Sequence, residues 1–160
     1  MIEQLQEFAA GFPEWAQWLA VALVSMIPFV ESYFGSVIGV AIGLHPVVAV
    51  VAAVAGNAVS MLIFVLSVHA TRRKVRETRG TADLEASPKR QRLKRMFDRF
   101  GVPGVSLLGQ TLLPSQITSA AMVGFGASKN AVIGWQIVSI VLWGALFGCL
   151  SYFGIELLLR

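Results

Sequence analysis

The sequence predicts an all-α integral membrane protein, in which two inverted repeats each combine a re-entrant helical hairpin with a transmembrane helix, and amphipathic helices lie at the membrane interface. Composition favours this class: the 160 residues are 56% hydrophobic and 14% charged, against about 45–50% and about 25% in soluble domains. Residues 46–68 and 131–155 contain no acidic or basic side chain. Each stretch is long enough for a bilayer-spanning helix, which needs about 20 apolar residues.

The first repeat covers about residues 15–68. Before it, apolar residues recur at helical spacing over residues 2–12, which is typical of a short amphipathic helix lying in the membrane interface. Two apolar pieces follow, 16–30 and 33–44, and Glu31 separates them. Each piece is too short to cross a bilayer comfortably. We therefore predict a broken hairpin ahead of the 46–68 span.

A basic segment separates the repeats. Eleven of the 13 Lys and Arg residues lie between His69 and Arg99, so the basic isoelectric point of the chain is a property of this segment. An excess of Lys and Arg beside a transmembrane helix is typical of a cytoplasmic loop, and we prefer this interpretation to a nucleic-acid surface. Its second part predicts a basic amphipathic helix, with Ser87 as its cap and Pro88 at its first position.

The second repeat covers about residues 100–155, and the whole chain forms one membrane domain, 1–160. Residues 100–128 carry no acidic or basic side chain, and we expect Pro103 and Pro114 to break this stretch. Gly43 and Gly126 follow Glu31 and Pro114 by the same twelve residues, and a long span then follows each. With residues 69–99 cytoplasmic, the two halves have opposite orientations, as in inverted-repeat transporters, and both termini lie outside.

Glu31 is the first candidate site residue. An ionised side chain inside a bilayer is costly and usually faces a cavity or a partner. Burial favours the protonated form of a carboxyl group, so Glu31 can take up and release a proton. The alternative is that Glu31 lies near the interface and only orients the hairpin. Asn57, in the first span, either bridges helices or lines the same path.

The second candidate group surrounds the break at Pro114 and comprises Gln110, Gln116 and Thr118. These side chains either satisfy backbone groups that the break leaves without partners or form a polar site. If the two hairpins face each other, the same side chains face Glu31. The repeat pattern predicts this arrangement near the middle of the membrane.

Glycines and the remaining motifs complete the analysis. Gly35, Gly39 and Gly43 recur every four residues, which favours close helix packing. Cys149 stands alone in an apolar run, so the sequence predicts no disulfide and no metal site. No nucleophile elbow, paired carboxylates in an apolar segment or histidine cluster is present, and we expect neither an enzyme nor a bound cofactor.

The pattern "E…G…G…GLHP…AGN", ending at Asn57, and the later stretch "LLPSQITSAAMVGFGASKNAVIGWQ" resemble the small multidrug export protein family. More distantly, the chain resembles the DedA/VTT superfamily of re-entrant-hairpin membrane proteins. Gly124 belongs to this agreement, as does Thr118. Arginines that flank the second hairpin's proline in DedA-type proteins have no counterpart here, where Thr111 and Ile117 stand near those places.

The resemblance implies two facing hairpins, a homodimer and a location in the bacterial cytoplasmic membrane. It also implies a carrier or flippase that moves an amphiphilic small molecule or a lipid carrier, with protons as possible coupling ions. The alternative is a protein that transports nothing and organises membrane lipids or partners through its basic amphipathic helix. The sequence identifies neither the substrate nor the direction of transport.

Overall fold

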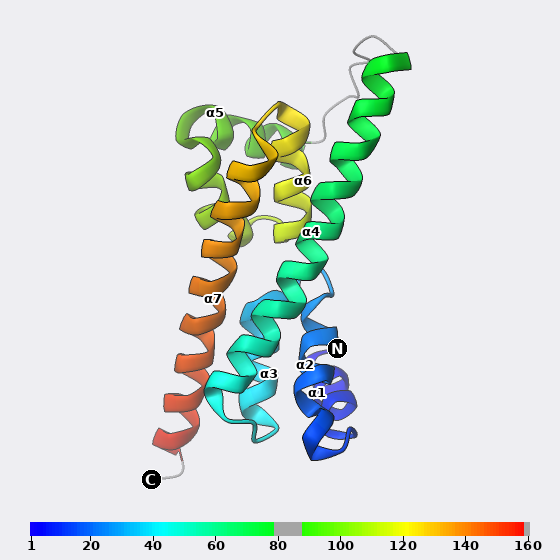
Figure 1. The fold of residues 1–160 in the computed structure, drawn as a ribbon. Helices are drawn as coiled ribbons and strands as arrows, with labels where there is room; N and C mark the ends of the chain where they lie inside the picture. The colour runs from blue at the N-terminus through cyan, green and yellow to red at the C-terminus, as the bar shows by residue number, and fades with distance from the viewer. Residues whose placement is uncertain (79–87, 159–160) are drawn as a thin grey trace. The chain divides into compact units, whose positions relative to one another are not determined.

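The computed structural model describes residues 1–78 and 88–158, and within these ranges the chain is helical and contains no strand (Figure 1). The chain divides into two compact units. Unit 1 comprises Met1–Ser60 and Ile140–Arg160, and unit 2 comprises Met61–Ser139. The predicted all-α class is confirmed for the described residues.

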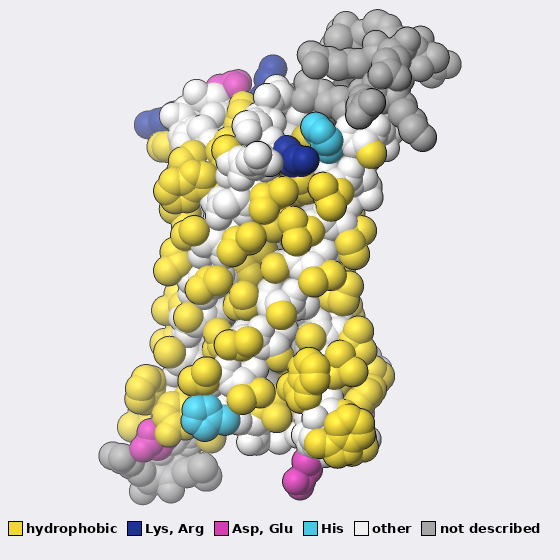
Figure 2. Space-filling model, in the orientation of Figure 1, with side chains coloured by type: hydrophobic (Ala, Val, Ile, Leu, Met, Phe, Trp, Pro, Cys, Tyr) yellow, Lys and Arg dark blue, Asp and Glu magenta, His cyan; other side chains and the backbone are white. Residues whose placement is uncertain are grey.

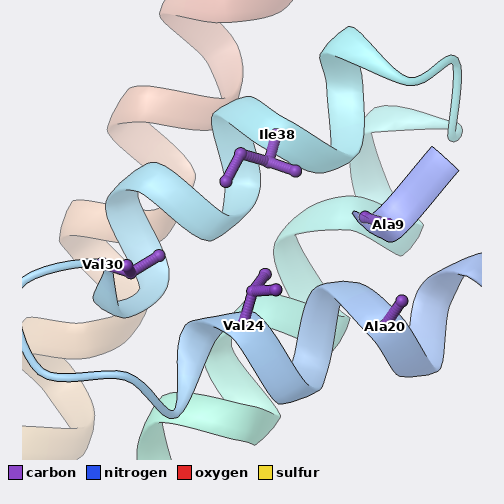
Figure 3. Packing of buried hydrophobic residues seen from close by; sticks show 5 residues of the cluster. All are labelled: Ala9, Ala20, Val24, Val30 and Ile38. Carbon is purple, nitrogen blue, oxygen red and sulfur yellow. The ribbon is translucent and has the colours of Figure 1, made fainter. Parts of the chain in front are cut away.

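Unit 1 begins with a set of short helices. These are α1 (Ile2–Ala10), the 3-10 turn η1 (Glu14–Ala16), α2 (Gln17–Ser25) and α3 (Glu31–Ala41). The predicted N-terminal helix is confirmed as α1. Ala9 on α1 packs with Ala20 and Val24 on α2 and with Val30 and Ile38 at α3, and Figure 3 shows these five side chains together. The apolar sides of three short helices therefore form one core.

The break between α2 and α3 spans residues 26–30, so the predicted break precedes Glu31, which itself begins α3. Pro28 explains the break, because proline lacks an amide hydrogen and disfavours helical geometry at the preceding residue. Phe29 and Glu31 adopt φ values of 74° and 53°, in the left-handed region. A bulky residue is rarely found there, and the chain turns sharply at this point.

Two long helices follow the short ones: α4 (Pro46–Thr78) and α7 (Lys129–Leu158). Within the described residues, Pro46–Thr71 and Lys129–Leu158 are long and apolar enough to cross a membrane, by length and composition. Large apolar side chains on both helices are exposed, and Figure 2 shows apolar side chains over most of the drawn face. α4 also extends past the predicted span, because residues 69–78 contain no Gly or Pro and several good helix formers.

In unit 1, small residues bring α4 close to α2 and α3. A Cβ atom on Gly39 would lie 2.6 Å from the Cβ atom of Ala49, and one on Gly56 would collide with the carbonyl oxygen of Ala22. Further along α4, the Ser60 hydroxyl donates to the carbonyl oxygen of Met26 at 2.8 Å. α4 therefore reaches the break between α2 and α3.

Unit 2 contains α5 (Pro88–Leu108), the 3-10 turn η2 (Gly109–Thr111) and α6 (Ser115–Phe125). α5 begins at Pro88 as predicted, while the predicted cap Ser87 lies outside the described residues. The expected break at Pro103 is wrong: the helix is interrupted at Gly101, with φ 63° and ψ −164°. This conformation is essentially restricted to glycine, whereas Pro103 lies in the turn that follows, where proline is tolerated.

The ends of α3 and α6 share one hydrogen-bond pattern. After α3, the amides of Gly43 and Leu44 donate to the carbonyls of Val40 and Gly39; after α6, those of Gly126 and Ala127 donate to Val123 and Met122. Gly43 and Gly126 both have positive φ, which is the Schellman arrangement. The four residues at the end of α6 each stand 83 positions after the equivalent residues at the end of α3. The same interval separates Pro46, which begins α4, from Lys129, which begins α7.

Candidate functional site

Both units bury polar side chains among their described residues. In unit 1 these are Ser25, Glu31, Ser32, Ser36, Asn57 and Ser60; in unit 2 they are Ser106, Gln110, Ser115, Gln116, Thr118, Ser119, Gln136 and Ser139. Glu31 is the only ionisable side chain among them. Burying a polar group is costly unless it forms hydrogen bonds, so each group requires a structural or functional explanation.

Glu31 is fully buried at the first position of α3. Its amide donates to the carbonyl oxygen of Ile27 at 3.2 Å, across the break. The next residue, Ser32, donates its hydroxyl to the carbonyl oxygen of Ile140 on α7 at 2.8 Å. A left-handed, non-glycine residue costs about 1–3 kcal/mol and persists only where the surroundings fix it. The contacts on both sides therefore hold the Glu31 backbone in this conformation.

Asn57 is also fully buried in unit 1, on the part of α4 that approaches α2. Its neighbour Gly56 lies against the Ala22 carbonyl. One turn later, Ser60 binds the Met26 carbonyl at the break. Asn57 therefore lies on α4 between the contact with α2 and the contact with the break.

In unit 2, the predicted site residues flank the second break. Gln110 lies in η2, and Pro114 is the extended residue ahead of α6, with φ −54° and ψ 149°. Gln116 and Thr118 are fully buried on α6. The Thr118 hydroxyl lies 3.2 Å and 3.1 Å from the carbonyl oxygens of Pro114 and Ser115. The Thr118 hydroxyl thus bonds carbonyl oxygens at the start of its own helix, and the Pro114 carbonyl also accepts the Thr118 amide at 2.9 Å.

Gln136 and Ser139 on α7 complete this polar group, and the sequence analysis did not identify them. Gln136 Nε2 donates to Thr118 Oγ1 at 2.9 Å and to the Ser115 carbonyl at 3.3 Å, while Ser139 donates to the Ser106 carbonyl at 2.7 Å. The sequence feature that could have identified them is a glutamine and a serine three residues apart in an apolar span, which places both side chains on one helical face. The sequence prediction considered only the absence of charged residues from this span.

Several polar atoms of unit 2 form no hydrogen bond. Among the described residues, both amide atoms of Gln110, the hydroxyl of Ser106 and Oε1 of Gln136 are buried and lack a hydrogen-bond partner. Each such atom in a native structure requires an explanation, such as a catalytic or binding role or an ordered water. The group around the second break is therefore polar, uncharged and incompletely satisfied.

One hydrogen bond recurs in both units. Ser36 donates to the Ser32 carbonyl and Ser119 donates to the Ser115 carbonyl, each at 2.6 Å. These pairs again stand 83 positions apart. The same register relates Glu31 to Pro114, so the sequence's two candidate positions occupy equivalent places in the two units. Their predicted approach to each other joins residues of different units and stays a prediction.

The glycines named from the sequence have different surroundings. A Cβ atom on Gly35 would collide with the Ser25 hydroxyl, and one on Gly39 would contact Ala49. Gly43 and Gly126 end their helices with positive φ. A Cβ atom on Gly124 would meet nothing within 4 Å. The first two permit close packing and the next two permit turns.

In the part of the chain that the structure describes, no three His, Cys, Asp or Glu side chains are grouped to hold a metal ion. Comparison with known proteins found no matching family model, curated protein or solved structure. Function is therefore inferred from the site itself.

Proposed function

We propose that this chain is a DedA-like, multi-pass carrier of the bacterial cytoplasmic membrane that exports or flips an amphiphilic small molecule or lipid carrier, coupled to protons. The two long apolar helices supply the membrane spans. The short helices supply the hairpins: α2 and α3 have 9 and 11 residues, so at 1.5 Å per residue they measure roughly 14 and 17 Å. A bilayer core is about 30 Å thick, so neither helix crosses it singly, and in the proposal this hairpin enters and returns.

The repeated pattern supports two inverted repeats. Breaks, Schellman ends and long helices recur with one register, and so does the serine hydrogen bond. In inverted-repeat carriers the substrate binds near the membrane midplane, where broken helices meet. By this comparison, the proposal assigns the functional residues to the break of each repeat: Glu31 in the first, and the polar residues around Pro114 in the second.

The observation that carries the proposal is the buried carboxyl group of Glu31 on a strained helix break. Acidic residues inside membranes are rare and mark ion paths and proton relays. Strained residues of this kind gather at sites that bind ligands or switch conformation. A carboxyl group that is buried in one state and hydrated in another exchanges a proton during the cycle.

The exposed apolar side chains of the two long helices indicate which partners the proposed carrier contacts. Many large apolar side chains of α4 and α7 are exposed, and in the proposed setting membrane lipids and a second copy of the chain cover them. We therefore include a homodimer in the proposal. Two spans and two hairpins make a small body, and dimerisation covers the polar hairpin tips.

Reconstituted vesicles test the proposal. Purified protein is reconstituted in liposomes that contain fluorescent single-chain amphiphiles with neutral, anionic or cationic head groups. The movement of these probes between the leaflets is followed by quenching with external dithionite. We expect faster movement of at least one probe than in protein-free vesicles, with a rate that depends on an imposed pH gradient. Glu31→Gln removes the dependence on the gradient because the amide exchanges no proton.

The matched control is Glu14→Gln, which neutralises an exposed acid of the same unit and leaves transport unchanged. Movement of every probe at the protein-free rate contradicts the carrier. If Glu31→Gln responds to the gradient as the wild-type protein does, the proton role of Glu31 is wrong.

One observation favours the alternative, a lipid-organising scaffold. The apolar side of α5 is packed within unit 2, with Leu93 buried and Phe97 against Phe125 at 5.8 Å. Its cationic side chains Arg92 and Lys94 are exposed. A scaffold predicts that neutralising these cations abolishes function while Glu31→Gln has no effect.

A further inference from the structure

The uncharged polar group of unit 2 contains the atoms that lack partners, and the helices that carry these atoms contact one another. Ser139 donates to the Ser106 carbonyl, so α7 contacts α5 at this point. Gln136 stands one turn before Ser139 and binds Thr118 of α6 at 2.9 Å. A Cβ atom on Gly109 would lie 3.4 Å from Thr118 Cγ2. Gly109, the residue before Gln110, and Gln136 therefore both adjoin Thr118.

The free atoms define what they can bind. Gln110 offers an amide donor and a carbonyl acceptor, Gln136 a carbonyl acceptor, and Ser106 a hydroxyl that both donates and accepts. A complementary ligand must therefore donate and accept hydrogen bonds at once. Hydroxyl and carboxamide groups have this property, whereas carboxylates only accept and ammonium groups only donate.

The absence of charged side chains from this buried group also favours an uncharged ligand. The described buried polar residues of unit 2 are serine, threonine and glutamine, without an acid or a base. An ion bound there has no opposite charge beside it, and an unpaired buried charge is strongly unfavourable. An anion would also meet two carbonyl oxygens, and a cation would meet an amide hydrogen.

We infer that unit 2 binds the uncharged, hydrogen-bonding head group of an amphiphile, a hydroxyl or carboxamide, at Ser106, Gln110 and Gln136. As a statement about the transported substrate, this rests on the proposed carrier function. As a statement about binding, it rests on unit 2 alone. The site then distinguishes neutral head groups from phosphates, carboxylates and amines.

Four probes with one ten-carbon tail test the inference: decanamide, 1-decanol, decanoate and decylamine. The protein is placed in lipid nanodiscs, and its thermal unfolding midpoint is measured against probe concentration without any gradient. We expect saturable upward shifts with decanamide and 1-decanol and none with the two ions. Because a charged head group lowers partitioning into the bilayer, the shifts are compared at equal measured concentrations of membrane-bound probe.

Variants assign the binding to these atoms. Gln110→Leu weakens binding of both neutral probes at least tenfold, and it does not lower the unfolding midpoint of the free protein, because it removes a buried amide that has no partner. Ser106→Ala, which retains the carbonyl that Ser139 binds, weakens binding of both neutral probes without a change of fold and gives an independent test. Gln91→Leu, the same change at an exposed position of unit 2, leaves the shifts intact.

Equal shifts from all four probes, or no saturable shift from any, overturn the inference. A lower midpoint of free Gln110→Leu without probe binding also overturns it, since internal water then satisfies the amide. If the neutral probes bind selectively but no probe is transported, the proposed carrier function is wrong and the binding site remains supported. If only charged amphiphiles are transported, the carrier function remains supported and the proposed binding site is wrong.

Discussion

Single residues carry the least ordinary features of this chain. Glu31 combines complete burial with a left-handed backbone, and Gln110 combines burial with an amide that lacks partners. A sequence that optimised stability alone would avoid both, because strain and unsatisfied polar groups each lower the free energy of unfolding. Such departures concentrate at functional sites. The glycines, by contrast, serve packing and turns, and their surroundings separate the two roles.

Two glycine substitutions should have opposite effects. Gly56→Ala places a methyl group on the Ala22 carbonyl oxygen, so we expect the free energy of unfolding to fall by about 1–3 kcal/mol through overpacking. Gly124→Ala, where the added Cβ meets nothing within 4 Å, should raise it by about 0.4–1 kcal/mol by restricting the unfolded chain. Thermal unfolding of both variants in one detergent measures the difference. Equal midpoints would contradict the close contact between α2 and α4.

At the scale of elements, breaks in helices rather than the helices themselves position the site. The first break precedes Glu31 and the second precedes α6, and each is followed by an 11-residue helix. An earlier interruption divides α5 at Gly101. The part of α5 before Gly101 places Leu93 near Gly109. The part after Gly101 places the Ser106 carbonyl where it accepts a hydrogen bond from Ser139 of α7. The conformation of one glycine thus affects the polar group.

Gly101→Ala should disturb unit 2 for this reason. At φ 63° and ψ −164° a Cβ atom is strongly disfavoured, and we expect a loss of about 1–3 kcal/mol in the free energy of unfolding. Gly134→Ala is the matched control, because that position in α7 has open space around it. Thermal unfolding of the two variants gives the comparison. A Gly101→Ala midpoint at or above that of the wild-type protein would show that the interruption is not required.

The sequence predicted the elements better than their interruptions. Hydrophobic length identified α4 and α7, and helical periodicity identified α1 and the start of α5, because both signals are averages over many residues. The break at Gly101 was assigned to Pro103, since proline is the stronger local signal although its place in a first turn is harmless. Gln136 was missed because its role depends on hydrogen bonds to α6, which no single-segment pattern contains.

At the scale of the whole molecule, the proposal depends on which segments cross the membrane. α4 and α7 are long enough, whereas α2 and α3 pack side by side through Val24, Val30 and Ile38 (Figure 3) and are too short to cross singly. In the proposed carrier, two crossings place residues 1 and 160 on one side. The proposal then places the basic residues between the two long helices on the other side, the cytoplasmic one, because an excess of Lys and Arg is typical of cytoplasmic loops.

Cysteine labelling of intact cells tests this topology. The exposed Cys149 is first replaced by serine, and single cysteines are introduced at the exposed positions Glu14, His45 and Lys94. Glu14 and His45 flank the α2–α3 hairpin, so a hairpin that enters and returns leaves both open to a membrane-impermeant maleimide. Lys94→Cys should react only after the membrane is permeabilised. Labelling of Glu14→Cys without His45→Cys would mean that α2 and α3 together cross the bilayer, and the predicted re-entrant hairpin of the first repeat would then be wrong.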